Sequence, residues 1–486
     1  MSMPIPIISI AQMREWERAT WATGQTEMEV IRRVGAALAR RALELTHPDD
    51  AILILAGKGH NGDDARAARE FLNERRVETL DVIAPESNLP ELEQALSQKP
   101  ALIIDGLFGI GLDRPLTGDW KKFIGTVNQS GIPVLAVDVP SGLNADTGEP
   151  TSPGAAIEAA VTLTIGAPKT GLLAQNAWAF VGRLEVVGDV GLAPCPHTNG
   201  LNWTLPEDFR NFPPRRAVAG HKGAFGHLEI VAGSLGFHGA AVLAARAAQC
   251  AQPGLITLFT QESVYHAVAA QLQSVMVNLW APDIKLPDSA SAVLIGPGLA
   301  APGLTDFMSL TTRRIWRDSP LPVIADASAL DWLPMGASAK NAIRILTPHP
   351  GEAARLLNLP KQHVQANRPH AVREISRRFG NCWVVLKGYQ TLVGRNAGLR
   401  SNGAASPPEG EIFVNPSGNP HLAQGGSGDA LAGYLAGLLA QHPLQADVGK
   451  LIRYAVWQHG AAADQLQAAR ANWVIEDLIG ELGNAR

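Results

Sequence analysis

The residues of this chain best suited to chemistry lie in the stretch 415–439, where a run of small residues directly precedes an acid. Gly425, Gly426, Ser427 and Gly428 lead into Asp429, and an apolar helical segment begins at Ala430. Small residues let backbone N–H groups converge on an anion, and a helix N-terminus adds positive dipole character. The stretch predicts a phosphate site at which Asp429 takes a proton from an attacking hydroxyl. Such a stretch in isolation is more often a glycine-rich turn with the acid as an ordinary N-cap.

Polar turns that follow predicted strands in the second half of the chain favour the phosphate site over the plain turn. They are 232–240, 296–298, 326–330, 347–352 and 387–391. Any one of them alone is more often a simple connection, and His349 alone would as often be a packed loop histidine. Ligands of open α/β sheets bind where the strands end. The turns together therefore predict a ligand cleft.

Acidic residues follow predicted strands in the first part of the chain as well. Gly57–Gly62 formally fits G-x-G-x-x-G, but the acid expected about 20 residues later is Asp81, which we place inside a strand. The loop continues with Asp63 and Asp64, whose charges disfavour a pyrophosphate and favour a cation or a polar ring amide. Asp105 and Asp138 each follow a further predicted strand, where either one alone would be a cap to the next turn.

Short apolar runs separated by helical stretches place these residues in two α/β domains. We expect a mostly parallel sheet with strands at 51–56, 79–84, 101–104, 134–137 and 161–165. A second set of strands is expected at 228–232, 255–259, 292–295, 323–325, 343–346 and 383–386, with a helix at 240–249. Prolines gather between Val190 and Gly220, which predicts a linker and domains of 1–205 and 206–486. The segment Ser401–Gly410 is expected to be a surface loop.

Length and composition limit the class of protein. A chain of 486 residues exceeds what one core usually supports, so two domains are the default. The net charge of −4, without charged blocks, excludes nucleic acid and membrane surfaces as expected partners. The 3 cysteines lie far apart, and no signal peptide or long apolar run is visible. We expect a cytoplasmic enzyme that forms a homo-oligomer.

The motifs of the second part resemble the ADP-dependent NAD(P)H-hydrate dehydratases, a family of the ribokinase-like superfamily. The matching segments are 221–227, 232–241, 296–299, 347–352, 386–388 and 425–433, so the resemblance spans about Gly220 to the C-terminus. It implies a substrate, NADH or NADPH, damaged by addition of water at C6 of the nicotinamide ring. It also implies that Ala240, Gly298, His349 and Asp429 line the hydrate site, and that Lys387, Gly388, Tyr389, Gln390, Thr391 and Gly428 bind ADP.

The chemistry that this resemblance implies agrees with the phosphate site. Hydroxide is a poor leaving group, so the C6 hydroxyl of the S epimer is phosphorylated and the ring nitrogen then expels phosphate, with AMP as the second product. Asp429 would act as the base and the amides of 425–428 as the phosphate cradle, with Mg²⁺ neutralising the nucleotide phosphates. Ser427 stands where the family more often has Thr, and His421-Leu422 where it has Gly-Met.

The first part, about residues 8–190, resembles the NAD(P)H-hydrate epimerase domain. The matching segments are 8–13, 57–64, 105–115 and 138–148. The resemblance implies potassium at Asn61, Asp105 and Ser141, with Asp138 shuttling the hydroxyl proton of the hydrate. It implies hydrate contacts from His60, Asn61, Gly62, Asp63, Asp64, Gly109, Ile110, Gly111, Leu112, Asp113, Arg114, Pro115 and Asp138. His60, Asp63 and Ala65 replace the Asn, Gly and Gly that are usual in the family loop.

Three functional hypotheses follow. The first is a two-activity enzyme of metabolite repair, in which a Rossmann-like three-layer sandwich epimerises the hydrate and a ribokinase-like domain dehydrates it. The second is a ribokinase-like small-molecule kinase with an accessory N-terminal domain. The third makes the N-terminal domain a non-catalytic module for nucleotide binding or oligomerisation. The fused first domain and the Lys387-Gly-Tyr turn favour the two-activity enzyme.

Overall fold

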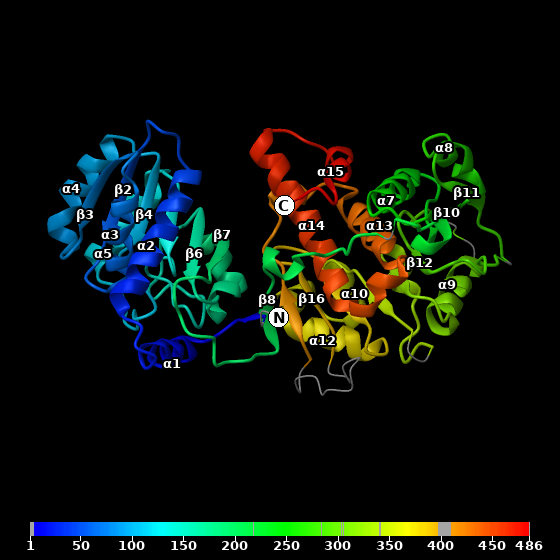
Figure 1. Cartoon of the computed structure of the whole chain (residues 1–486), viewed down its shortest axis with the longest axis horizontal. Helices are drawn as coiled ribbons and strands as arrows, with labels where there is room; N and C mark the ends of the chain where they lie inside the picture. Colours follow the sequence, from blue (N-terminus) through cyan, green and yellow to red (C-terminus); the bar gives the residue numbers. More distant parts are fainter. Residues whose placement is uncertain are drawn as a thin grey trace. The chain divides into compact units, whose positions relative to one another are not determined.

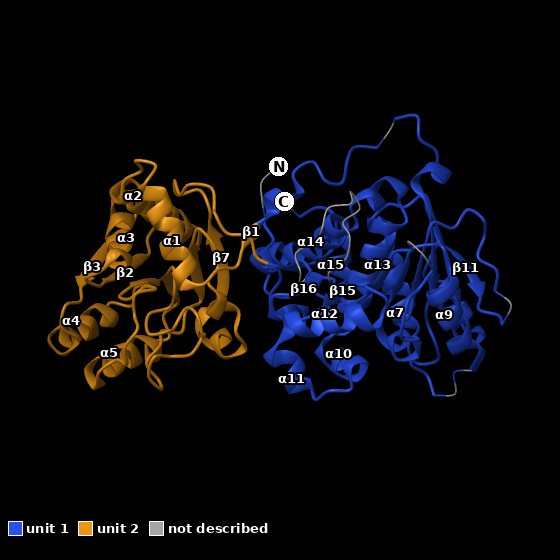
Figure 2. Cartoon of the chain, turned by 90° about the horizontal axis from the view of Figure 1, so that it is seen from below, with its two compact units in different colours: residues 1–4, 200–486 blue, residues 5–199 orange. Residues whose placement is uncertain are grey.

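The computed structural model describes residues 4–216, 218–282, 284–302, 304, 306–339, 342–396 and 410–485. The predicted surface loop Ser401–Gly410 lies outside these residues except for Gly410. The chain forms two compact units, one of residues 5–199 and one of residues 1–4 and 200–486 (Figure 2). The N-terminal unit therefore ends at Asn199, in the segment where the prolines gather.

The N-terminal unit is built on a parallel sheet with the strand order β3-β2-β4-β5-β6-β7 (Figure 1). Its strands are β2 (Ala51–Ala56), β3 (Arg76–Asp81), β4 (Leu102–Gly106), β5 (Val134–Val137), β6 (Val161–Ile165) and β7 (Arg183–Val187). The side chains of β2 and β4 alternate between two separate apolar clusters. A sheet that buries both faces in this way requires helices on both sides.

Helices cover both faces of that sheet. One cluster joins Ile52 and Ile54 to α2 (Glu27–Glu44) and α3 (His60–Ala68). The other joins Leu53 and Leu55 to α4 (Pro85–Ser97) and α5 (Gly118–Gln129). The short helix α6 (Trp178–Val181) precedes β7, and α1 (Ile10–Trp21) packs in a cluster of its own. These layers confirm the predicted three-layer sandwich.

The C-terminal unit contains a larger sheet with the order β8-β17-β16-β15-β14-β13-β12-β9-β10-β11. Only β16 runs antiparallel to its neighbours within this series. The strands are β8 (Leu201–Trp203), β9 (His227–Val231), β10 (Leu255–Thr260), β11 (Met276–Leu279), β12 (Ala292–Ile295), β13 (Val323–Ala325), β14 (Arg344–Leu346), β15 (Trp383–Leu386), β16 (Leu392–Gly394) and β17 (Ile412–Val414). Parallel neighbours bring the turns after β9, β12, β13, β14 and β15 to one edge.

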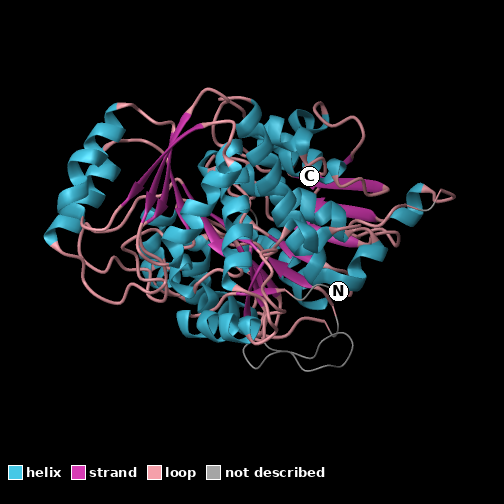
Figure 3. Ribbon diagram, turned by 60° about the vertical axis from the view of Figure 1, so that its left-hand side comes forward, coloured by secondary structure: helices cyan, strands magenta, loops and turns pink. Residues whose placement is uncertain are grey.

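Helices follow most of the strands along this unit as well, and Figure 3 distinguishes the two kinds of element by colour. Its main core contains side chains of α7 (His238–Cys250), α13 (Ser427–Leu439), α14 (Val448–Ala469) and α15 (Ile475–Glu481). The other helices are α8 (Tyr265–Ala269), α9 (Asp306–Asp318), α10 (Pro350–Leu357), α11 (Lys361–Ala366) and α12 (Arg368–Arg378). No helix within the described ranges is both long and apolar enough to span a bilayer. The α/β fold class of both units is confirmed.

Glycines let α7 and α13 approach closely. A Cβ atom at Gly433 would lie 2.0 Å from the Ala244 carbonyl oxygen, and one at Gly437 would lie 2.5 Å from that of Ala248. The contacts advance four residues along both helices at once, so the two helices run in the same direction. Their N-termini therefore meet at one end, which places Ala240 and Asp429 on the same side of the unit.

The structure corrects the predicted elements mainly at short or exposed strands. β3 ends at Asp81 instead of spanning 79–84, so Asp81 closes the strand and does not lie inside it. β3 is an edge strand whose side chains are exposed or half-buried, so it shows no continuous apolar run. The predicted linker contains β8, and β7, β11, β16 and β17 were not predicted.

We predict that a fragment of residues 200–486 is more stable than one of residues 205–486. The shorter fragment lacks β8, which pairs with β17, and Trp203 is only 1% exposed. Loss of a buried Trp side chain costs about 3 kcal/mol or more. Urea unfolding of the two fragments measures the difference, and equal midpoints would contradict it.

Candidate functional site

The glycine-rich turn of the C-terminal unit leads directly into α13. Gly426 is the N-cap, with a φ of 96° that favours glycine, and a Cβ there would lie 2.5 Å from the Leu243 side chain. Asp429 lies in the first turn of the helix, three residues after the cap. The alternative in which Asp429 is the N-cap is therefore wrong.

A histidine that the sequence analysis missed holds this turn. His459 of α14 is buried, and its Nε2 lies 3.1 Å from the Ser427 carbonyl oxygen. Burial lowers the pKa of His459 to about 4, so the ring is neutral and its Nε2–H donates to that carbonyl. No motif surrounds His459 in the sequence, and only the packing of α14 against α13 brings it to the turn.

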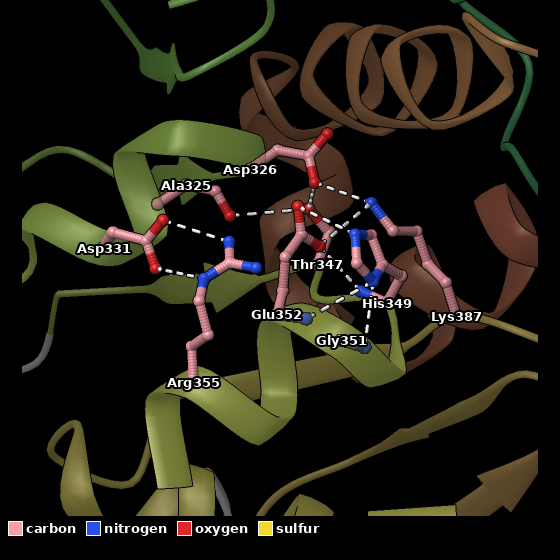
Figure 4. A network of polar contacts seen from close by, with 9 residues as sticks. All are labelled: Ala325, Asp326, Asp331, Thr347, His349, Gly351, Glu352, Arg355 and Lys387. Carbon is pink, nitrogen blue, oxygen red and sulfur yellow. Dashed lines mark hydrogen bonds and ion pairs between the residues drawn. The ribbon is translucent and has the colours of Figure 1, made fainter. Parts of the chain in front are cut away.

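Lys387 joins the turns that follow three neighbouring strands (Figure 4). Its Nζ donates to Asp326 Oδ1 at 2.8 Å and lies 3.9 Å from Glu352 Oε2. Thr347 Oγ1 donates to the same Asp326 oxygen at 2.7 Å. Burial lowers the pKa of Lys387, but Asp326 and Glu352 raise it by more, so the net shift is upward and the ammonium stays charged.

His349 caps the helix α10 instead of packing in a loop core. Its Nδ1 accepts hydrogen bonds from the backbone N–H groups of Gly351, at 3.0 Å, and Glu352, at 3.3 Å. In return the Glu352 carboxylate accepts from the His349 backbone N–H at 2.7 Å (Figure 4). Burial lowers the pKa of His349, although the charge of Glu352 raises it, so the ring is uncharged. The ring is half-exposed, and Nε2 is the nitrogen that does not bond the start of the helix.

Asp429 is electrostatically coupled to this network. Burial raises the pKa of Asp429 to about 7; Asp326 adds to the rise and Lys387 opposes it. A carboxylate with a pKa near 7 can accept a proton at neutral pH and then donate it. The site thus contains one ammonium, held by Asp326, and one carboxylate poised to act as a base.

The predicted nucleotide segments are neighbours. Lys387 Nζ lies 3.2 Å from where a Cβ of Gly428 would be, so the lysine reaches the glycine-rich turn. The turn after Lys387 contains Gly388 with a φ of 134° and Gln390 with a φ of 52°. Thr391 Oγ1 donates to the Gly388 carbonyl oxygen at 2.9 Å. The buried guanidinium of Arg368, which the sequence analysis missed, donates to the Tyr389 carbonyl oxygen at 2.6 Å and orders this turn.

Ala240 and Gly298, predicted for the hydrate, lie side by side. A Cβ at Gly298 would lie 3.0 Å from the Ala240 Cβ and 2.3 Å from the Phe237 carbonyl oxygen, and the φ of Gly298 is 66°. Ser234 Oγ donates to the Gly298 carbonyl oxygen at 2.6 Å. Any side chain at position 298 would therefore fill the space beside the first turn of α7.

The N-terminal unit contains a cavity of about 680 Å³. Ten of the predicted residues line it: His60, Asn61, Asp64, Gly109, Ile110, Gly111, Leu112, Asp113, Arg114 and Asp138. Gly62, Asp63 and Pro115 do not line it. Asp63 pairs with Arg66 at 2.9 Å, and a Cβ at Gly62 would lie 2.1 Å from the Gly57 carbonyl oxygen. Met13 and Glu17 of α1, together with Phe108 and Trp120, line the cavity and were not predicted.

Asn61, Asp105 and Ser141 converge beside this cavity around the Phe108 carbonyl oxygen. Asn61 Nδ2 donates to that oxygen at 2.9 Å. Ser141 donates twice to Asp105, from Oγ at 2.6 Å and from its backbone N–H at 2.8 Å. Burial raises the pKa of Asp105 to about 6, although the bonds from Ser141 oppose this. No basic side chain of the described residues bonds Asp105, so its charge lacks a partner.

Asp138 is held differently, by a buried lysine that the sequence analysis missed. Lys169 is fully buried, and its Nζ donates to Asp138 Oδ1 and to the Ile165 carbonyl oxygen, the latter at 3.0 Å. Thr164 Oγ1 and the Ile165 backbone N–H donate to the same Asp138 oxygen at 3.0 and 2.9 Å. Asp138 has a φ of 62° at the end of β5, which is uncommon for a residue other than glycine. The Oδ1 atom of Asp138 thus accepts hydrogen bonds from three donors, and Asp138 still lines the cavity.

Comparisons with known proteins identify a family for each of the two units. A family model described as NAD(P)H-hydrate dehydratase matches residues 228–482, and one described as YjeF-related protein N-terminus matches residues 75–171. The relative named bifunctional NAD(P)H-hydrate repair enzyme Nnr from Coxiella burnetii is 33% identical over 93% of this chain and 93% of its own length. The protein of that name from Escherichia coli is 31% identical, with 96% and 91% covered.

A similar solved structure is the ADP/ATP-dependent NAD(P)H-hydrate dehydratase from Bacillus subtilis, co-crystallised with ATP and Mg²⁺. It is 30% identical and covers 57% of this chain and 95% of its own, with a TM-score of 0.49. The chain belongs to the family of bifunctional NAD(P)H-hydrate repair enzymes, which combine an epimerase domain with a dehydratase domain. The prediction of a two-activity repair enzyme is confirmed.

We predict that Lys387→Met lowers the free energy of unfolding by about 3 kcal/mol, because Asp326 would be left buried without its cation. Lys361→Met, at an exposed position in α11, serves as the matched control and should change stability by less than about 0.5 kcal/mol. Urea unfolding measures both. A loss no larger in Lys387→Met than in the control would show that the ion pair does not stabilise the fold.

Proposed function

We propose that Asp429 is the base of the ADP-dependent dehydration in the C-terminal unit. It takes the proton of the C6 hydroxyl, and the oxygen then attacks the terminal phosphorus of ADP and releases AMP. The ring nitrogen next expels phosphate from C6, and loss of a C5 proton restores the dihydropyridine ring. The observation that carries this proposal is the position of Asp429 in the first turn of α13, where burial raises its pKa to about 7.

Nucleotide and hydrate would both bind beside Asp429. The turn 387–391 and Gly428 would hold ADP, with Lys387 facing the phosphates and the N–H groups of 425–428 cradling the transferred one. Ala240, Gly298 and His349 would line the hydrate. Among the described residues no group of three or more His, Cys, Asp or Glu could hold a metal ion. Mg²⁺ would therefore enter on the nucleotide phosphates.

Asp138 would carry out the epimerisation in the N-terminal unit. The R and S hydrates differ at C6, whose hydroxyl can leave with the help of the ring nitrogen and return from the other face. A carboxylate can accept the proton of the incoming water and stabilise the positive ring. Potassium would be held by Asn61, Asp105 and Ser141, which offer hard oxygen atoms around a buried carboxylate without another cation.

Both activities can be followed in one experiment. NADH hydrate of known epimer composition is incubated with the enzyme and ADP, ATP or no nucleotide, and the absorbance of the reduced ring is recorded. We expect it to return with ADP and, after the S epimer is consumed, to continue at the rate at which the R epimer is converted. Phosphorylated hydrate that accumulates without ring recovery would favour the small-molecule kinase.

We predict that Asp429→Asn lowers the dehydration rate by about 10²–10⁴ with little change in ADP binding, because the amide keeps the shape but cannot accept the proton. In the wild-type enzyme the rate should rise with pH through about 7, as Asp429 loses its proton. The measurements are the pH–rate profile with pure S epimer and calorimetric titration with ADP.

The matched control is Asp306→Asn, an exposed carboxylate in the first turn of α9. It should keep both the rate and its pH dependence. Turnover of Asp429→Asn at the control's rate would exclude Asp429 as the base.

We predict that Asp138→Ala stops conversion of R to S hydrate without affecting dehydration of pure S epimer. Asp138 and Asp429 belong to different units, so the second activity reports on the enzyme concentration and on the fold of the C-terminal unit. Chiral chromatography over time, without nucleotide, measures the conversion. Wild-type enzyme that interconverts the epimers no faster than buffer would favour a non-catalytic first domain.

A further inference from the structure

The cavity of the N-terminal unit is lined by more carboxylates than the proposed reaction has so far used. Asp138 follows β5, Asp64 lies in α3, Glu17 lies in α1, and the exposed Asp113 lies in the loop between β4 and α5. Asp63, the neighbour of Asp64, turns away from the cavity and pairs with Arg66. The carboxylates at the cavity thus come from separate elements of the unit and line one shared cavity.

The carboxylates differ in how their charge is compensated. Within the described part of the chain Lys169 is the only buried basic side chain that bonds any of them, and it bonds Asp138. Asp64 is only 6% exposed, lines the cavity and makes no ion pair or side-chain hydrogen bond with any described residue. One buried ammonium can compensate one carboxylate. A second buried carboxylate that neither pairs with a cation nor accepts a hydrogen bond, unlike Asp105, is favoured in its protonated form.

The arrangement therefore contains an ionised and a protonated carboxyl group that face the same substrate space. We propose that Asp64 is the general acid of the epimerisation and acts together with Asp138 as the general base. This inference rests on the proposed epimerase function and adds to it the residue that makes the hydroxyl leave. Neutral acid and ionised base in one pocket are the pairing that proton transfer in both directions requires.

The groups that face Asp64 support the assignment. Burial raises the pKa of Asp64 well above its ordinary range, and Asp138, Asp63 and Glu17 add to this rise, while Lys169 opposes it. Burial and Asp138 also raise the pKa of Glu17, which Lys169, His60 and Arg14 lower. Glu17 is less buried than Asp64. Of these carboxyl groups, Asp64 is accordingly the one that is buried and bonds no basic side chain.

The step balances in atoms and protons. Asp64 gives its proton to the C6 hydroxyl, the C6–O bond breaks, and water leaves while the ring nitrogen lone pair forms a C=N bond. Water then adds to C6 from the opposite face, and Asp138 takes its proton. The enzyme now holds the proton on Asp138, which is the form that converts S back to R. Exchange through water returns the proton to Asp64 for the next turnover.

The test compares Asp64→Asn with Glu70→Gln in the full-length chain. Glu70 is an exposed carboxylate just beyond α3 and lies outside the cavity, so its change is the matched control. Each variant is given R hydrate without nucleotide, and the epimers are separated over time. We expect Asp64→Asn to lower kcat by about 10²–10⁴ with KM changed less than about threefold, while the control keeps the wild-type rate.

Two further readouts separate an acid from a structural residue. In the wild-type enzyme and the control, epimerisation should slow as pH rises and Asp64 loses its proton; the residual activity of Asp64→Asn should lack this decline. Dehydration of pure S epimer by the same chain should be unchanged, which shows that the C-terminal unit is folded and that the enzyme is measured at the right concentration. The KM for R hydrate reports on the fold of the first unit. Glu17→Gln, tested alongside, should retain the alkaline decline.

Each outcome has one meaning. If wild-type enzyme fails to epimerise, the proposed function of the first unit is lost. If wild-type enzyme epimerises and Asp64→Asn stays within about threefold of it, the role of Asp64 is excluded and the proposed function stands. Loss of rate and of the alkaline decline in Glu17→Gln, with Asp64→Asn active, would transfer the acid role to α1 and overturn the inference.

Discussion

Burial of a charged lysine beside an aspartate is the interaction on which both sites depend. In the C-terminal unit Lys387 pairs with Asp326 and spans the turns after β13, β14 and β15. Removing either partner would leave an uncompensated charge in a place with little water. The pair therefore fixes the separation of these turns. It thereby also fixes the space between the glycine-rich turn and the N-terminal cap of α10.

The same pairing has a different consequence in each unit. Lys387 pairs with Asp326, and burial raises the pKa of the nearby Asp429 to about 7 although Lys387 opposes the rise, which suits the proposed base near neutrality. Lys169 instead compensates Asp138 itself and leaves Asp64 without a cation. Which carboxylate receives the ammonium decides which group is ionised and which is protonated. The same pair of residue types thus occurs in both sheets with different results. In the C-terminal unit the lysine bonds a carboxylate other than the proposed base, and in the N-terminal unit it bonds the proposed base itself.

The features that could be predicted from the sequence were those that residues close together in the sequence determine. Strands buried on both faces, such as β5 and β12, were predicted with the observed bounds because they read as continuous apolar runs. β3 was misplaced because an edge strand exposes polar side chains, and β8 was taken for linker because three residues carry no periodic pattern. Motif residues such as Asn61 and Asp429 were found, whereas His459, Arg368 and Lys169 act on partners that only the fold brings near.

The position of β8 has a consequence for how the protein is made. Its register pairs Leu201 with Ile412, so the strand emerges from the ribosome long before the one it binds. At typical synthesis rates this interval lasts roughly ten to forty seconds. During that time Trp203, which ends only 1% exposed, lacks its neighbour β17 and offers an apolar surface to chaperones or to other nascent chains. The residues of the first unit are therefore all synthesised while β8, at the start of the second unit, still lacks β17.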